Sequence, residues 1–497
     1  MKRGIGSQVK SGALWIYSFS ILFTAIQFLV GIILARILGP ADFGVFIAAT
    51  AFTTVLSSLV NFGFPQALVH REHVNRKNYN SAYWVMFFIA ILCFYTMWQS
   101  ANWLQQLYQD ERFTRLLLIM SLTFFLLPYI AVNRSLLLRE MDIKTLNVIR
   151  LKTMMFSVPT SISFALLGFG PFSLAAGGIV GLMARTTFFW KRTHWLPQLP
   201  VIKHARSMIP YAFKTNLNIV QNVASERIDN MLVGALVGTA ALGNYNRAYS
   251  LSRLPLEILA ENIQPLLFSG LSRIQHNKEH THMLYHKSLC ALSLSVYPFL
   301  VLFWLIAADF IRFVYGEAWV LAVEPLQIMC IGSAATLLTL SFRSISAAQG
   351  LVGREAWVHL AGLILLVTMI VIFSRWGITG VAIGVIIKEL IVVLIFQRVI
   401  VKSHLGFGWG SLIRAILPAI IACLISAALI NLLYIYFPDT HGLRLVAISV
   451  VFLGSYPLIV KLIAYIWDTH QELKSVMGMV NEIFSKIING HVFKRPV

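Results

Sequence analysis

Charged residues are scarce in this chain. Only 12% of its 497 residues are charged and 58% are hydrophobic, whereas about a quarter of the residues in a soluble domain carry a charge. Apolar runs recur along the whole length, and a helix needs roughly 20 such residues to cross a bilayer. These features exclude a soluble globular protein and predict a membrane protein with many spans.

Catalytic and metal-binding motifs are also missing. The four cysteines fall inside apolar runs, at spacings that suit neither a disulfide framework nor a metal site. No glycine-rich phosphate-binding loop is present, and the histidines lack metal-ligand spacing. We therefore expect no cofactor and a transporter rather than an enzyme. Its energy would come from a proton or sodium gradient, the membrane potential or consumption of the product.

Fourteen helical spans are predicted from the apolar runs. Their approximate ranges are 14–38, 42–68, 81–103, 113–138, 148–168, 172–192, 208–237, 242–268, 285–314, 319–347, 356–375, 379–400, 410–436 and 443–466. Basic residues gather in the connections on the side of the N-terminus, among them Lys77, Arg139, Lys144, Arg150, Lys152 and Arg206. The positive-inside rule then predicts that both termini face the cytoplasm from a bacterial inner membrane. Most of the net charge of +20 is thereby explained without a nucleic-acid partner.

The segment at residues 467–497 differs from the spans before it. Its apolar residues recur at helical spacing with glutamates and lysines between them. This pattern predicts an amphipathic helix on the cytoplasmic surface of the bilayer, with a helix that binds a partner protein as the alternative.

The chain repeats itself at offsets of about 200 residues. Gly39 and Gly44 align with Gly238 and Gly243, and further along Arg134 aligns with Arg343. Parallel repeats of this kind are typical of transporters, whose substrate site lies between the two halves. The predicted organisation is a six-helix lobe at 1–192, a cytoplasmic linker at 193–207, a six-helix lobe at 208–402 and a helix pair at 403–466.

Two segments carry a resemblance to a known family. LARILGPADFG follows the first span, and DNMLVGALVGTAALGNYNRAY joins the seventh span to the eighth. With the length and the number of spans, they resemble the polysaccharide transporter family, which includes the O-antigen and exopolysaccharide flippases. This family belongs to the multidrug, oligosaccharidyl-lipid and polysaccharide exporter superfamily.

The resemblance implies a V-shaped transporter of two lobes that alternate access around a cationic cavity. Its substrate would be an undecaprenyl-diphosphate-linked oligosaccharide, moved from the cytoplasmic to the periplasmic leaflet for polysaccharide biosynthesis. A polysaccharide polymerase and a chain-length regulator are the partners that it suggests. Lipid II flippases of the same superfamily are a more distant match.

Polar residues inside the spans predict where the substrate binds, since charged groups in a membrane usually face a cavity or a partner. They recur at three- and four-residue steps along 208–237 and 242–268, and so share a helix face. The predicted substrate-binding residues are Arg36, Arg134, Lys214, Asn218, Asn222, Arg247, Arg253 and Arg343. Glu226, Asp229 and Glu257 are the predicted coupling or gating residues.

Each of these predictions has a structural alternative. Arg134 and Arg343 could extend to lipid headgroups from the helix ends, and Asp229 could form a permanent ion pair with Arg247 or Arg253 instead of alternating between an arginine and an ion. Pro255 predicts a bend that is either a moving gate or a static kink. At the level of function, the alternatives are a drug or organic-cation antiporter of the same superfamily and, less favoured, a membrane polysaccharide polymerase.

Overall fold

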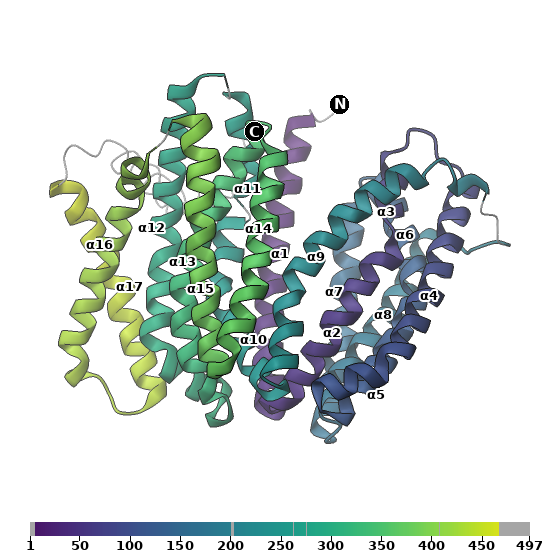
Figure 1. The fold of residues 1–497 in the computed structure, drawn as a ribbon, viewed down its shortest axis with the longest axis horizontal. Helices are drawn as coiled ribbons and strands as arrows, with labels where there is room; N and C mark the ends of the chain where they lie inside the picture. Colours follow the sequence, from purple (N-terminus) through teal and green to yellow (C-terminus); the bar gives the residue numbers. More distant parts are fainter. Residues whose placement is uncertain (1–4, 200–202, 262, 275, 407, 467–497) are drawn as a thin grey trace. The chain divides into compact units, whose positions relative to one another are not determined.

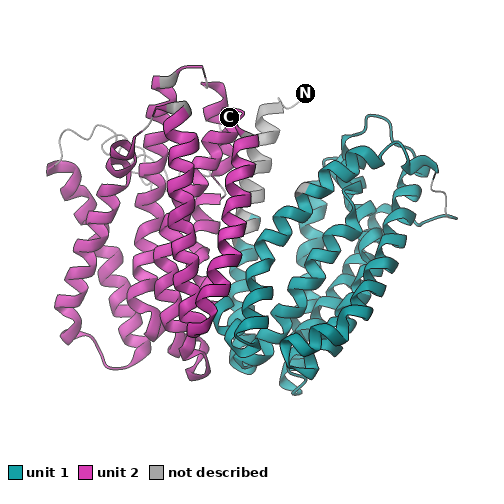
Figure 2. Ribbon diagram, in the orientation of Figure 1, with its two compact units in different colours: residues 1–246 teal, residues 247–497 magenta. Residues whose placement is uncertain are grey.

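The computed structural model describes residues 5–199, 203–261, 263–274, 276–406 and 408–466 (Figure 1). Every regular element within these ranges is helical, which confirms the predicted all-α class. The amphipathic segment predicted at 467–497 lies outside the described residues. Contacts divide the chain into two compact units, 1–246 and 247–497 (Figure 2).

The first unit holds ten helices, the last of which continues into the second unit. They are α1 (Ile5–Ile37), α2 (Pro40–Asn61), α3 (Phe64–His70), α4 (Arg76–Tyr108), α5 (Glu111–Ser121), α6 (Leu127–Arg139), α7 (Ile143–Leu166), α8 (Pro171–Thr193), α9 (Ile209–Leu236) and α10 (Thr239–Pro255). The unit therefore includes α9, which the repeat assigns to the second lobe. The predicted lobe boundaries and the V shape stay predictions.

The second unit continues with seven helices. They are α11 (Gln264–Arg273), α12 (Lys278–Phe310), α13 (Val323–Ala348), α14 (Val352–Phe373), α15 (Gly377–Phe396), α16 (Trp409–Leu433) and α17 (His441–Ile466). Its core lies where α12, α13, α15 and α16 pack together, with Phe342 and Phe396 fully buried.

Three predicted spans are each broken into two helices, so that the seventeen helices described correspond to the fourteen predicted spans. Phe62 and Gly63 separate α2 from α3 with positive φ angles of 46° and 69°. The pair α5 and α6 is bent by 43°, and α10 changes to a π-helical turn after Pro255. Each following helix has proline in its first turn, where the missing N–H costs no hydrogen bond (Pro65, Pro128 and Pro265).

Eight helical stretches in the described residues are long and apolar enough to cross a membrane, and nine if the bent pair counts as one span. This number is below fourteen partly because α14 and α15 form one continuous stretch, Gly353–Ser403. In addition, α9 carries charged residues, including Lys214 and Asp229, that lower its hydropathy. The protein is nevertheless a multi-pass membrane protein.

Gly44 and Gly243, which the repeat aligns, lie where α2 and α10 pack against each other in the first unit. A Cβ atom on Gly44 of α2 would lie 1.6 Å from the Thr239 carbonyl oxygen, and one on Gly243 of α10 would lie 2.0 Å from the Pro40 carbonyl oxygen. The two contacts are reciprocal, because Pro40 aligns with Thr239 at the offset that aligns Gly44 with Gly243. The repeated motif therefore lets the first turns of α2 and α10 cross with their backbones touching.

Contacts within the first unit place its connections at two ends. At one end the Arg112 guanidinium donates to Asp42 at 2.7 Å and to Asp110 at 2.9 Å. Burial acts to raise the pKa of Asp110, but the hydrogen bonds from Arg112 outweigh it and keep that pKa below its ordinary value. At the other end Arg139 donates to the Leu68 carbonyl at 2.9 Å. Connections that alternate between two ends are what membrane-crossing helices require.

Candidate functional site

The predicted arginine on α6 lies among other cations. Arg134 is exposed, one and a half turns before α6 ends, and it is close enough to Arg150 on α7 and Arg185 on α8 for the three groups to repel one another. The guanidinium carbon of Arg150 also lies 3.5 Å from the centre of the Phe23 ring. No carboxylate in the described part of the chain pairs with any of the three. Arg134 was predicted from the sequence, whereas Arg150 counted only as a cation that sets the topology and Arg185 was missed.

The predicted polar stripe of α9 is exposed in one part and buried in another. Lys214, Asn222 and Glu226 are exposed. Asp229, which is closer to the C-terminal end of α9, is buried. The side chain of Asn218 lies outside the described part of the structure. Arg36, near the end of α1, is exposed. The stripe can therefore face water or substrate over its first part only.

Asp229 holds the end of α9 against α10. Its carboxylate accepts hydrogen bonds from the Tyr245 hydroxyl at 3.3 Å and from the Asn230 backbone N–H at 2.7 Å. The Asn246 amide donates to the Asn230 side chain at 3.3 Å. Arg247 belongs to the second unit, so its predicted pairing with Asp229 stays a prediction.

The predicted arginines of the second unit have different surroundings. The Arg247 guanidinium lies 5.4 Å from the Tyr315 ring centre and 5.5 Å from that of Trp319. Arg253 donates to Glu261 at 2.9 Å across the π-helical turn. Glu257 is exposed.

A cavity of about 310 Å³ with charged residues in its lining brings some of these residues together. It is lined by both partners of the Arg343–Glu355 ion pair, whose atoms are 3.2 Å apart. Glu261, the partner of Arg253, lines it as well, together with Gln264. The sequence singles out Arg343 but not Glu355, since a lone glutamate at the start of an apolar run gives no pattern.

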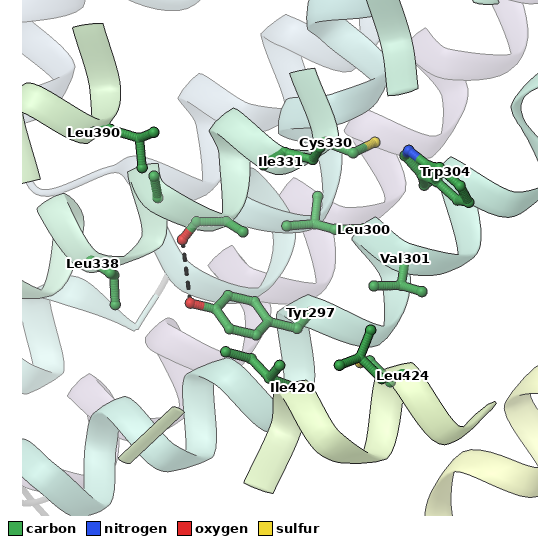
Figure 3. Close-up of a pocket in the computed structure, with 13 residues that line it drawn as sticks. Tyr297, Leu300, Val301, Trp304, Cys330, Ile331, Leu338, Leu390, Ile420 and Leu424 are labelled. Carbon is green, nitrogen blue, oxygen red and sulfur yellow. Dashed lines mark hydrogen bonds between the residues drawn. The ribbon is translucent and has the colours of Figure 1, made fainter. Parts of the chain in front are cut away.

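A second cavity of about 480 Å³ in the same unit is almost wholly apolar (Figure 3). Leu300 and Trp304 of α12, Ile331 of α13 and Leu424 of α16 line it. Its main polar group, the Tyr297 hydroxyl, donates to the Ala334 carbonyl at 3.3 Å. A cavity with this lining can accept a hydrocarbon chain but offers no group for catalysis. In the described residues no cluster of His, Cys, Asp and Glu has the arrangement of a metal site.

Comparisons with known proteins agree with the resemblance seen in the sequence. A family model described as polysaccharide biosynthesis protein matches residues 33–324. An uncharacterized membrane protein in the cps region of Klebsiella pneumoniae is 23% identical over 79% of this chain and 82% of its own length. The lipopolysaccharide biosynthesis protein WzxC of Escherichia coli strain K12 is 21% identical over 82% of this chain and 83% of its own.

One solved structure also shares the fold. The lipid II flippase MurJ, in an inward closed conformation, matches with a TM-score of 0.68 and 16% identity, over 90% of this chain and 99% of MurJ. At this identity the likeness establishes the fold alone. Together these findings show a helical membrane protein that shares the fold of this structure and is related to proteins of polysaccharide biosynthesis.

Proposed function

This chain belongs to the polysaccharide biosynthesis protein family, and on this premise we propose that it is a flippase for lipid-linked oligosaccharides. Its substrate would be an undecaprenyl-diphosphate-linked repeat unit, moved from the cytoplasmic to the periplasmic leaflet. The family match carries the proposal, because it covers residues 33–324, more than half of the chain. A polysaccharide polymerase and a chain-length regulator are the proposed partners.

The chemistry of the second unit supports this substrate class. Arginines are suited to phosphate because the planar guanidinium donates two parallel hydrogen bonds and stays charged. Arg343 supplies such a group in the lining of one cavity, and a second, nearly apolar cavity of the same unit suits a hydrocarbon chain. An exporter of organic cations would instead need cavities dominated by carboxylates and aromatic rings.

For energy coupling we propose Asp229, with Glu226 and Glu257 as secondary candidates. A buried carboxylate that exchanges an internal partner for a proton or sodium ion can link ion entry to movement of the helices, since breaking a buried pair is costly unless the ion replaces the partner. The burial of Asp229 and its hydrogen bond from Tyr245 are consistent with this role. Unchanged gradient dependence of transport in an Asp229→Asn variant would exclude it.

For orientation we propose both termini in the cytoplasm of a bacterial inner membrane. The four native cysteines are buried, so a membrane-impermeant thiol reagent should label the unmodified protein weakly. In intact cells with a permeabilised outer membrane, Asp439→Cys should react, because its exposed side chain lies in the predicted periplasmic loop. Lys77→Cys should react only after the inner membrane is opened. Labelling of Lys77→Cys in intact cells would reverse the proposed orientation.

Deletion of the gene tests the function in the cell. We expect loss of the surface polysaccharide and accumulation of complete lipid-linked repeat units, because the units are still assembled but do not reach the periplasmic polymerisation step. Extraction of lipid-linked saccharides followed by mass spectrometry measures both the amount and the length of the glycan. Accumulation of nothing, or of partly built units, would point to a role in assembly and contradict a flippase.

A further inference from the structure

The helices α7 and α8 meet along a seam of small residues that ends in two arginines. A Cβ atom on Gly177 would lie 1.8 Å from the Ser161 hydroxyl oxygen, and one on Gly181 would lie 2.9 Å from the Ser157 Cβ and 3.4 Å from a Thr153 methyl. Small residues at these positions let the two helices pack closely, and α7 and α8 are in more extensive contact than any other helix pair.

Helical periodicity extends this seam to charged residues. Arg185 comes one turn after Gly181 on α8, and Arg150 comes one turn before Thr153 on α7, so both continue the faces that meet at the seam. Arg134 of α6 joins them, and electrostatic repulsion links all three groups. All three lie one to three turns from the end of the unit where α6 is joined to α7.

A carboxylate between α6 and α7, that of Asp142, already has other partners. Asp142 caps α7 by accepting from the Thr145 backbone N–H at 3.1 Å, and it accepts from Arg192 at 3.0 Å. The hydrogen bonds from Thr145 and Arg192 hold the pKa of Asp142 below its ordinary value. It therefore serves as the cap and the partner of Arg192, and it forms no ion pair with the three arginines.

At the aligned positions in the second unit, a carboxylate offsets the positive charge. The offset of 209 residues that aligns Arg134 with Arg343 also aligns Arg150 with His359. On α8 the offset is 207 residues, which aligns Gly177 with Gly384 and Arg185 with Val392. Arg343 and His359 both contact Glu355, at 3.2 Å and 3.6 Å. One repeat thus supplies its own carboxylate, and the other has cations at all three positions and, within the residues that the structure describes, no carboxylate paired with them.

We propose that Arg134, Arg150 and Arg185 form a phosphate-binding site that receives the diphosphate of the lipid-linked substrate. Three neighbouring guanidinium groups that pair with no carboxylate of the described residues are unfavourable in the empty protein, and they become favourable when a polyanion adds charge-assisted hydrogen bonds. Phe23 contacts the Arg150 guanidinium through a cation–π interaction, which uses the face of the group and not its N–H donors. This assignment rests on the proposed flippase function for the identity of the ligand but not for its phosphate chemistry.

Binding to the full-length protein in a neutral detergent tests the site without any transport. The probe is farnesyl diphosphate, a soluble prenyl diphosphate, and the readout is the rise in thermal unfolding temperature with ligand concentration. Farnesol and phosphatidylglycerol are the comparison ligands, since the first lacks the diphosphate and the second presents a phosphodiester headgroup. We expect saturable stabilisation by farnesyl diphosphate and a weak response to the other two.

Charge-removing variants locate the site. Arg150→Gln and Arg185→Gln should each weaken farnesyl diphosphate binding by about tenfold or more, the usual effect of one charge-assisted hydrogen bond. Lys191→Gln is the matched control, because it removes one exposed charge from the same end of α8 and should bind normally. Without ligand, the two arginine variants should unfold at the same or a higher temperature, because a like-charge repulsion is removed. The Arg→Lys variants should bind with intermediate affinity.

Two results would overturn the proposal. One is unchanged binding of farnesyl diphosphate in both Gln variants. The other is an equal, arginine-dependent response to phosphatidylglycerol, which would make the cluster a lipid-headgroup contact. A failure of the proposed flippase function can be distinguished from a failure of this site. It would appear as normal lipid-linked saccharides and normal polysaccharide in the deletion strain, whatever the binding data show.

Discussion

Replacing Gly44 by alanine is expected to remove most of the folded protein from the membrane. The new methyl carbon would lie 1.6 Å from the Thr239 carbonyl oxygen and 2.5 Å from its carbon. Both atoms belong to the backbone, so no side-chain rotation relieves the overlap and α2 must move away from α10. Overpacking of a core costs about 1–3 kcal/mol, and we expect a loss at the upper end of that range or beyond it.

The yield of monodisperse protein from the membrane fraction, together with its unfolding temperature, measures this effect. Gly243→Ala should behave similarly, because its methyl would lie 2.0 Å from the Pro40 carbonyl oxygen. Gly178→Ala is the control, since no atom lies within 4 Å of its added methyl and alanine favours a helix. Normal yield and stability of Gly44→Ala would show that the two helices do not cross as closely as the structure has them.

Much of the fold follows from the sequence because hydrophobicity dictates it. A run of about 20 apolar residues has few stable forms in a bilayer other than a helix, so most of the fourteen spans could be placed within about five residues of their ends. The exceptions are α1 and α12, which begin nine and seven residues before the predicted starts at 14 and 285. A π-helical turn follows Pro255, where the sequence predicts a bend. Gly44 and Gly243 stood out as a repeat, although the sequence did not show that the two copies of the motif pack on each other.

The candidate site was less accessible from the sequence for two physical reasons. A regular helix would place Arg253, Glu257 and Glu261 on one stripe, but the π-helical turn changes the residue spacing between them. The structure leaves Glu257 exposed and pairs Arg253 with Glu261. A stripe calculated for an uninterrupted α-helix therefore does not reproduce the positions of these side chains.

Arg185 shows the second reason. It stands as a single charge inside α8, so no repeated polar pattern singles it out. Its significance comes from the packing of α7 on α8, which brings it to Arg150. Interhelical neighbours of this kind depend on tertiary contacts that one sequence does not specify.

Translocation in proteoliposomes tests the flippase function most directly, and it should show a large effect. The substrate is the lipid-linked repeat unit extracted from the deletion strain, and a membrane-impermeant glycosidase reports the fraction exposed on the outer leaflet. In vesicles without protein, the inner-leaflet pool should stay protected because the polar glycan crosses a bilayer extremely slowly. Vesicles with the purified protein should lose that protected pool within the time of the assay.

Arg253 provides the matched variants for this measurement. Arg253→Ala should slow the loss of the protected pool by about tenfold or more, since it removes a charge-assisted donor and leaves Glu261 without its partner. Arg253→Lys should be intermediate because it keeps the charge and loses the planar fork. The flippase function predicts that the wild-type protein empties the protected pool, and that Arg253→Ala empties it about tenfold more slowly or worse. A protected pool that persists with folded wild-type protein would contradict it.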